Sequence, residues 1–348
     1  KNIPPNVPSL VRPKRHFNTL LYTGNGSTQS ITGLEFAPDF VWIKERSSTS
    51  SHGLGDTVRG ALKVLQSDRT DAEVTTSTNF VSFDSHGFTH GSGGRVNENG
   101  QTYVAWCWKA GGAAVSNSDG SINSSVSVNQ EAGFSIVSYT GNNATGATVG
   151  HGLGKVPKWI IVKDRDTAGY NWHVYHDSIG ATKELKLNTL AAESTQAFWN
   201  NTAPTSSVFT VNGGGWEVNT DTKKHIAYCW AEIPGYSKFG SYKGNGSTDG
   251  TYVHLGFKPA FIITKQTNST GSWFIFDNKR NGYNETEPYV MSNVTNVEAT
   301  DLGWDLLSDG FKHRNSYAAT NGSGNTFIYM AFAEQPGVTP FDTFPNAK

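Results

Sequence analysis

Charged residues are scarce in this chain of 348 residues. Asp, Glu, Lys and Arg make up 16% of it, and the formal net charge is −1. A nucleic-acid-binding protein needs a basic face to neutralise phosphates, so nucleic acid is not an expected partner. No run of 18 apolar residues occurs, so we expect no insertion into a membrane.

Cysteine is almost absent as well. Cys107 and Cys229 are the two in the chain, and each lies in an apolar stretch that is expected to form a strand. The two occupy the same place in two similar segments, and equivalent strands of different domains do not normally meet. We therefore expect two small buried hydrophobic side chains, and neither a redox pair nor a zinc site.

Turn-forming and aromatic residues are abundant. The chain has 38 glycines, and Phe, Trp and Tyr make up 12% of it. Apolar runs rich in β-branched and aromatic residues alternate with Gly, Asn, Ser and Asp clusters, which predicts many short strands joined by turns. The length exceeds that of a single hydrophobic core, so two or three domains are expected.

One pattern is written three times along the chain. Each copy opens on a Tyr-x-Gly-Asn sequence, continues with an apolar strand between a proline and a lysine six residues later, and closes on an aromatic strand. The openings begin at Tyr22, Tyr139 and Tyr242, the proline-to-lysine strands are 38–44, 157–163 and 259–265, and the closing strands are 103–108, 225–230 and 327–332. Residues that recur are expected to be scaffold, and residues that do not recur mark places where function can differ.

The repeats predict an all-β protein of three tandem homologous β-sandwich domains of jelly-roll type. The expected boundaries are 17–112, 133–235 and 236–348, the last with a C-terminal tail. Residues 113–132 are rich in Gly, Ala, Ser and Asn and are expected to be a flexible linker. The second and third repeats follow each other closely, so we expect them to pack together and the first repeat to be more independent.

Residues 1–16 form a proline-rich basic segment before the first repeat. Proline removes backbone donors, so this segment is expected to be an extended arm. It either docks on a neighbouring protein through Arg12, Lys14 and Arg15 or is a disordered leader.

The repeated sequence motifs resemble a family of repeats in tail and other virion proteins of bacteriophages, including marine and cyanobacterial phages. The resemblance rests on Tyr-Thr-Gly-Asn-Gly from Tyr22, on the proline-to-lysine strand, and on Tyr-Val-Ala-Trp-Cys-Trp-Lys-Ala-Gly-Gly from Tyr103, and it extends from Phe17 to Gly337. It implies a location on the virion surface, on the tail or the capsid exterior, contact with the host, and other virion proteins as partners. It implies no catalytic residue.

The carboxylates of the sequence do not form a catalytic pattern. Cleavage of a polysaccharide needs two carboxylates across a groove, whereas the acidic residues here are scattered. Asp56, Asp177 and Asp277 are expected to occupy one recurring position and to cap turns. No loop offers a complete set of calcium ligands, so we expect neither an enzyme nor a bound cofactor or metal.

Aromatic residues that differ between the repeats are the candidate ligand-binding residues. Sugars present apolar CH faces together with hydroxyls, so exposed aromatic rings near Asn and Asp are the expected partners. Five residues have this setting: Trp199, Trp216, Trp304, Tyr170 and Tyr283. Trp106 and Trp108 lie in a recurring strand and are expected to be sandwich core.

These observations favour a non-enzymatic phage protein of the tail or tail fibre that adheres to a host surface polysaccharide. The alternatives are a capsid-decoration or connector protein and a polysaccharide depolymerase. A homo-oligomer, such as a trimer, is expected from the symmetry of such parts, although three repeats in one chain can also imitate a trimer.

Overall fold

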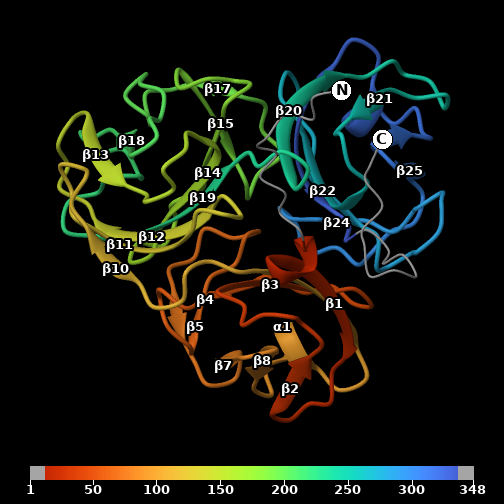
Figure 1. Ribbon diagram of the computed structural model, residues 1–348, viewed down its shortest axis with the longest axis horizontal. Coiled ribbons are helices and arrows are strands. Elements are labelled where there is room, and N and C mark those ends of the chain that lie inside the picture. The colour runs from red at the N-terminus through yellow and green to blue at the C-terminus, as the bar shows by residue number, and fades with distance from the viewer. Residues whose placement is uncertain (1–11, 336–348) are drawn as a thin grey trace, which may run out of the picture.

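The computed structural model describes residues 12–335, and the fold is all-β. Three lobes surround a common centre, and each lobe is one repeat (Figure 1). We call them the first, second and third units. Most of the expected arm, residues 1–11, and the end of the expected C-terminal tail, residues 336–348, lie outside the described residues.

The first unit begins with a short 3-10 helix and ends at the closing strand of the first repeat. Its elements are η1 (Pro13–Arg15), β1 (Phe17–Thr23), β2 (Gln29–Thr32), β3 (Phe40–Glu45), β4 (Gly53–Asp56), β5 (Lys63–Val64), β6 (Val74–Thr75), β7 (Phe80–Asp84), β8 (Gly87–His90), α1 (Gly94–Asn97) and β9 (Thr102–Trp108).

The second unit carries two strands before its repeat begins. Its elements are β10 (Val115–Asn117), β11 (Ser124–Asn129), β12 (Phe134–Thr140), β13 (Ala147–Gly150), β14 (Pro157–Asp164), β15 (Trp172–His176), β16 (Lys183–Lys186), β17 (Ser194–Thr195), β18 (Val208–Val211) and β19 (Lys224–Ala231).

The third unit follows without a linker. Its elements are β20 (Ser237–Lys243), β21 (Tyr252–His254), β22 (Pro259–Gln266), β23 (Trp273–Asp277), β24 (Val290–Met291), β25 (Trp304–Leu307), β26 (Gly310–His313), α2 (Ala318–Asn321) and β27 (Thr326–Ala333).

The same antiparallel sheet recurs in every unit. The opening strand pairs with the closing strand, which pairs with the proline-to-lysine strand, in the orders β1-β9-β3-β4, β12-β19-β14-β15 and β20-β27-β22-β23. A smaller sheet lies on the outer side: β2-β8-β7, β13-β18 and β21-β26-β25. An apolar cluster fills the space between the two sheets of each unit. Strands β7 and β8 form a hairpin whose turn spans residues 84–87.

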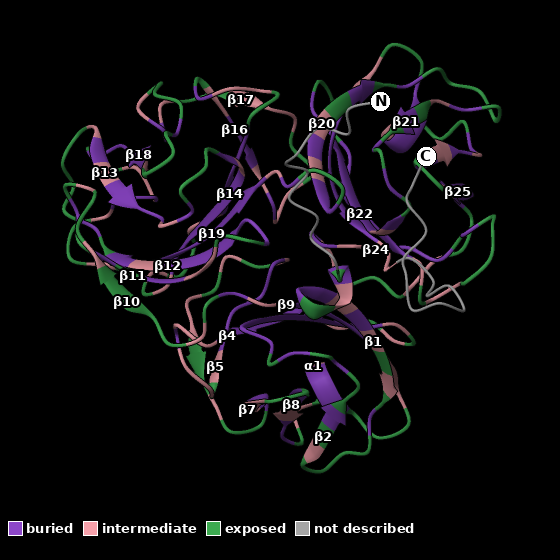
Figure 2. Ribbon diagram, viewed as in Figure 1, coloured by how far each residue is buried: buried purple, intermediate pink, exposed green. Residues whose placement is uncertain are grey.

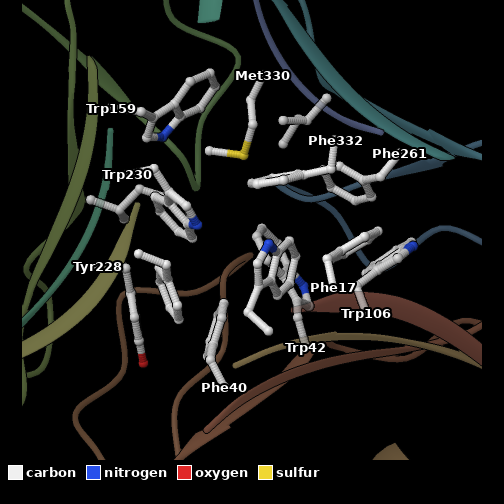
Figure 3. Packing of buried hydrophobic residues seen from close by; sticks show 14 of the residues in the cluster. Phe17, Phe40, Trp42, Trp106, Trp159, Tyr228, Trp230, Phe261, Met330 and Phe332 are labelled. Atoms are coloured by element: carbon white, nitrogen blue, oxygen red, sulfur yellow. The ribbon is translucent and has the colours of Figure 1, made fainter. Parts of the chain in front are cut away.

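The other face of each large sheet packs into one core that all three units share. Phe17 and Trp108 of the first unit meet Phe261 and Phe332 of the third, and the Phe17 and Phe332 rings are 5.2 Å apart (Figure 3). Phe40 likewise stacks on Tyr228 of the second unit at 4.3 Å. The expectation that the first unit is more independent is therefore wrong.

This arrangement explains why the closing strands are buried on both faces. Successive side chains of a strand point to opposite faces. In β9, Val104, Trp106 and Trp108 point into the shared core, whereas Ala105 and Cys107 face the outer sheet. Trp106 and Trp108 thus pack between units and not inside one sandwich. Cys107 and Cys229 are both fully buried, as expected.

The segment expected to be a linker is part of the second unit. Strands β10 and β11 lie within residues 113–132 and extend the large sheet through pairing of β11 with β12. Val126 of β11 is buried in the outer core of that unit. Its alternation with polar residues supplies one apolar face, and one face is enough for a strand at the end of a sheet.

The recurring Tyr-x-Gly-Asn sequence joins the opening strand to the loop before the closing strand. The Tyr22 hydroxyl donates to the Val96 carbonyl at 2.7 Å, and the Asn25 amide donates to Oδ1 of the buried Asn97 at 2.8 Å. The same bonds recur from Tyr139 and Asn142 and from Tyr242 and Asn245. A Cβ on Gly24 would collide with the Glu98 carbonyl, so glycine is required there.

The recurring lysine reaches across a unit boundary. Lys44, Lys163 and Lys265 are fully buried, and burial lowers the pKa of each ammonium to about 8. Each Nζ points to a backbone carbonyl of another unit: Thr295 at 3.3 Å, Thr70 at 3.4 Å and Leu190 at 3.4 Å, respectively. The three contacts form a closed cycle, so the units make a ring within one chain.

The carbonyls belong to three equivalent edge segments, residues 65–73, 185–193 and 290–298, which we call the clasps. Each clasp also accepts a hydrogen bond from a ring nitrogen of the next unit: Trp172 to Gln66 at 2.8 Å, Trp273 to Lys186 at 3.0 Å, and His52 to Met291 at 3.0 Å. Figure 2 shows the inner strands of all three lobes as buried, with exposed residues along the outer loops. The recurring residues are therefore scaffold.

Candidate functional site

A longer loop distinguishes the third unit from the other two. In each unit, the strand that follows the proline-to-lysine strand pairs with the start of the clasp. The paired residues are Leu54 and Leu65 in the first unit, Val174 and Leu185 in the second, and Ile275 and Val290 in the third. The connection between the paired residues is ten residues in the first two units and fourteen in the third. Four additional residues therefore lie between β23 and β24, in the loop that contains Tyr283.

Two asparagines brace this loop. The Asn284 side chain donates to the Leu306 carbonyl at 3.2 Å and accepts from the Leu306 amide at 2.9 Å, as a neighbouring strand would. The Asn281 side chain accepts from the Tyr283 amide at 3.2 Å and donates to the Glu285 carbonyl at 3.1 Å. These bonds hold the backbone on both sides of Tyr283, whose side chain remains 84% exposed.

The loop borders a recess of about 190 Å³, which we call the Tyr283 recess. Its lining is mostly polar: Lys258, Asn278, Asn281, Gly282, Tyr283, Asn284, Thr286, Leu306 and Glu334. Asn278 Oδ1 and Thr286 Oγ1 are buried in this lining and have no hydrogen-bond partner among the described residues. An unpaired buried polar atom costs about 1–3 kcal/mol, so the wall of the recess contains two atoms whose hydrogen-bonding capacity is unused.

A charged pair lies on the same lining. Glu334 accepts from the Asn278 amide at 2.9 Å and forms an ion pair with Lys258 at 2.8 Å. The recess thus offers an exposed aromatic ring, a carboxylate and an ammonium within one small surface. This set of groups suits a ligand with an apolar face and several hydroxyls, such as one sugar ring.

A family model described as a domain of unknown function (DUF7483) matches residues 12–336. The chain belongs to this family. The match covers all three units, so one family model takes in the entire ring. No curated protein and no solved structure matches the chain.

Two of the five aromatic residues expected to bind ligand are core residues. Trp304 is 0% exposed and stacks between Phe276 and Phe311, with ring centroids 4.1 Å and 5.1 Å away. Trp199 is 1% exposed and packs on Tyr175 at 5.9 Å. The prediction of ligand contact by these two residues is wrong, because a fully buried ring presents no face to a ligand.

Trp216 and Tyr170 are half-buried and do not line the Tyr283 recess. The Trp216 ring packs edge-on against Phe198 at 4.6 Å, and the Tyr170 carbonyl accepts a hydrogen bond from Lys163 at 2.9 Å. Both lie in the second unit, apart from Tyr283. The structure therefore does not bring the five predicted residues together, and Tyr283 alone lies at a polar recess.

The predicted docking residues lie where the described chain begins. Arg12 and Arg15 are exposed and Lys14 is half-buried, next to or within the 3-10 helix η1. Arg15 lies 3.8 Å from the Glu35 carboxylate. The rest of the expected arm lies outside the described residues, so docking through it stays a prediction.

Sequence reasoning missed most of the recess lining. Asn278, Thr286 and Glu334 are separated along the chain and have no motif in common. The signal that could have found them is the loop length, because the third copy has four residues more than the others between two recurring strands. The recurring aspartate was also misaligned: Asp56 and Asp277 pair with Phe40 and Phe261, but the residue that pairs with the equivalent Trp159 is His176, not Asp177.

A buried charge cluster in the second unit is a further feature that the sequence did not reveal. His173 lies between Glu184 at 2.8 Å and Glu217 at 2.9 Å. Burial alone would lower the pKa of His173, but hydrogen bonds to the two carboxylates outweigh it and raise the pKa. The ring stacks on Phe198 at 3.8 Å and is 1% exposed, so His173 belongs to the outer core of the second unit. In the described chain, no group of three His, Cys, Asp or Glu residues could hold a metal ion. Residues 12–335 also contain no helix that is long and apolar enough to cross a membrane.

Proposed function

We propose that this protein is a non-catalytic glycan-binding protein of a bacteriophage particle, displayed on its tail or tail fibre, and that it contacts host surface polysaccharide through the Tyr283 recess. The observation that carries the binding site is the inserted loop, which holds an exposed tyrosine at the edge of a polar recess. The phage setting is supported by the resemblance of the repeated sequence motifs to phage virion repeats.

The fold supports this use of the recess. A ring of three units with a shared core is a rigid base, and a site on a rigid base loses little conformational entropy on binding. A single small recess gives a weak contact. Many copies on a particle convert weak contacts into firm attachment, because each further binding event occurs at a raised effective concentration.

The test is retention of the purified chain, displayed in many copies on beads, on a panel of bacterial surface polysaccharides. Tyr283→Ala removes the aromatic face, and we expect a loss of about tenfold or more in affinity, as for one stacked aromatic residue. Tyr283 is 84% exposed, so the fold remains intact.

Tyr252→Ala is the matched control, because Tyr252 is an exposed tyrosine of the same unit, 43% exposed, that does not line the recess. Saturable retention that Tyr283→Ala abolishes and Tyr252→Ala preserves supports the proposal. Equal retention of both variants, or no retention on any polysaccharide of the panel, overturns it.

A further inference from the structure

The second unit also contains a feature that the other two lack. Strands β10 and β11 have no counterpart before β1 or β20 among the described residues. Together with β12 and β19 they border a recess of about 390 Å³, which we call the Lys224 recess. This volume lies in the range of small-molecule sites, which starts near 300 Å³.

Hydroxyl groups line this recess in register. Ser116 of β10 is directly opposite Ser125 of β11, which is directly opposite Ser138 of β12. Residues directly opposite each other point to the same face of a sheet, so the three hydroxyls form a row. Thr140 is paired with Lys224 beside this row and adds a fourth hydroxyl.

Two cationic groups face the same recess. Arg165 uses Nε and Nη2 to bind the Glu73 carboxylate, at 3.0 Å and 2.8 Å, and its Nη1 lies 3.3 Å from Ser138 Oγ. Lys224 is exposed, and its ammonium forms no ion pair with a carboxylate of residues 12–335. The Asp166 carboxylate accepts the Lys224 backbone amide at 2.8 Å and is the nearby negative charge.

We infer that the Lys224 recess binds an anionic sugar unit, with the carboxylate or sulfate group on Lys224 and Arg165 Nη1 and the sugar hydroxyls on the serine row. A charged acceptor forms shorter and stronger hydrogen bonds with ammonium and guanidinium donors than a neutral one. The inference rests on the proposed glycan-binding function and adds a second site with a different ligand class. The Tyr283 recess has a neutral ion pair at its edge, whereas the Lys224 recess has an unpaired ammonium.

The test is calorimetric titration of the full chain with trigalacturonate, with a sulfated galactose trimer, and with neutral galactotriose. Lys224→Gln removes the charge and keeps most of the side-chain length. We expect it to weaken binding of the anionic trimer by about tenfold or more, as for one charge-assisted hydrogen bond. Ser125→Tyr, at an exposed position of the row, fills the recess and is expected to abolish binding.

Lys223→Gln is the matched control, since it removes the same charge from the preceding residue, which does not line the recess. Binding of either anionic trimer that only Lys224→Gln and Ser125→Tyr reduce supports the inference, and the trimer that binds identifies the anion. The inference is overturned if neither anionic trimer binds, if galactotriose binds equally well, or if Lys224→Gln and Ser125→Tyr leave binding unchanged. Tyr283→Ala separates the two proposals: anionic-sugar binding that persists in this variant places the ligand at the Lys224 recess, whatever the polysaccharide panel shows.

Discussion

Two of the three boundaries between units contain a buried network of carboxylates and guanidinium groups, and the third does not. At the boundary of the first and second units, Glu73 joins Arg59 of its own unit to Arg165 of the next. At the boundary of the third and first units, Glu298 joins Arg280 to Arg46 in the same way. The side chains of Arg59 and Arg280 are 0% exposed, so both networks lie inside the protein.

The boundary of the second and third units has neutral or apolar residues at these positions. His176 and Ile179 lie where Asp56 and Arg59 are found in the first unit, and Met330 replaces Tyr228. Thr267 takes the place of Arg165, and its carbonyl still accepts the amide of a clasp glutamate, Glu193, at 2.8 Å. The backbone contacts are thus common to all boundaries, and the side-chain chemistry is not.

The comparison shows that the ring is closed by backbone geometry and apolar packing. Two boundaries contain a buried charge network, and a third boundary with the same backbone contacts lacks one. Buried ion pairs often stabilise no more than apolar residues of similar size, but breaking one leaves an uncompensated charge and is costly. The three boundaries should therefore respond very differently to the same substitution.

The largest difference is expected for the clasp glutamates. Glu73→Gln leaves the fully buried guanidinium group of Arg59 and the partly buried one of Arg165 without their shared carboxylate, and we expect a loss of about 3–5 kcal/mol in the free energy of unfolding. Glu193→Gln removes the equivalent carboxylate, whose partner Lys183 is 38% exposed, and is expected to cost less than about 1 kcal/mol. Urea unfolding measures both. Equal losses would show that the charge network contributes nothing specific to its boundary.

The repeats and the class of fold could be predicted from the sequence, because the motifs around Tyr22, Pro38 and Trp106 are short, continuous and recurring. Sequence reasoning missed the ring, since the partners of Lys163 and Trp172 are backbone carbonyls that no residue type marks. It placed Trp304 on the surface because glycine and aspartate flank it. In β25, however, successive side chains point to opposite faces, and the Trp304 ring points into the apolar cluster between the two sheets of the third unit. Tyr283 was a candidate because it does not recur between the repeats and its neighbours are polar, and its exposure fits that choice.

On acidification, the boundary of the second and third units should lose stability at a higher pH than the boundary of the first and second units. Burial lowers the pKa of His176 to about 4. In the neutral form, Nε2 of His176 donates to the Tyr329 carbonyl and Nδ1 accepts from the Ser178 amide. The unfolded state therefore binds more protons between pH 6.5 and 4, and the free energy of unfolding falls as the pH falls through this window. The full effect is about 3 kcal/mol at pH 4. Burial raises the pKa of Glu73, but Arg165 and Arg59 outweigh it and hold this pKa below 4.5, so the boundary of the first and second units weakens only at lower pH.

His176→Asn isolates this contribution, because asparagine offers one donor and one acceptor and does not titrate. The difference in unfolding free energy between the protein and this variant is expected to shrink from pH 7 to pH 4, as measured by urea unfolding at several pH values. The other buried histidines contribute equally to both proteins and cancel. Parallel pH profiles would contradict the assignment of the acid sensitivity to the boundary of the second and third units.

The smallest expected effect is the gain from adding charge to the neutral boundary. Thr267 occupies the position of Arg165, and its amide donates to Thr326 at 2.9 Å as that of Arg165 donates to Lys224 at 2.8 Å. Thr267→Arg should let a guanidinium reach Glu193, with the head group near the surface, since the Arg165 side chain is 11% exposed and that of Arg46 21%. A pair at the surface contributes less than about 1 kcal/mol, so a small rise in the urea midpoint is expected, with Thr267→Gln as the uncharged control. A rise in both variants would assign the gain to packing, and a loss above that size in Thr267→Arg alone would show that the apolar boundary excludes charge.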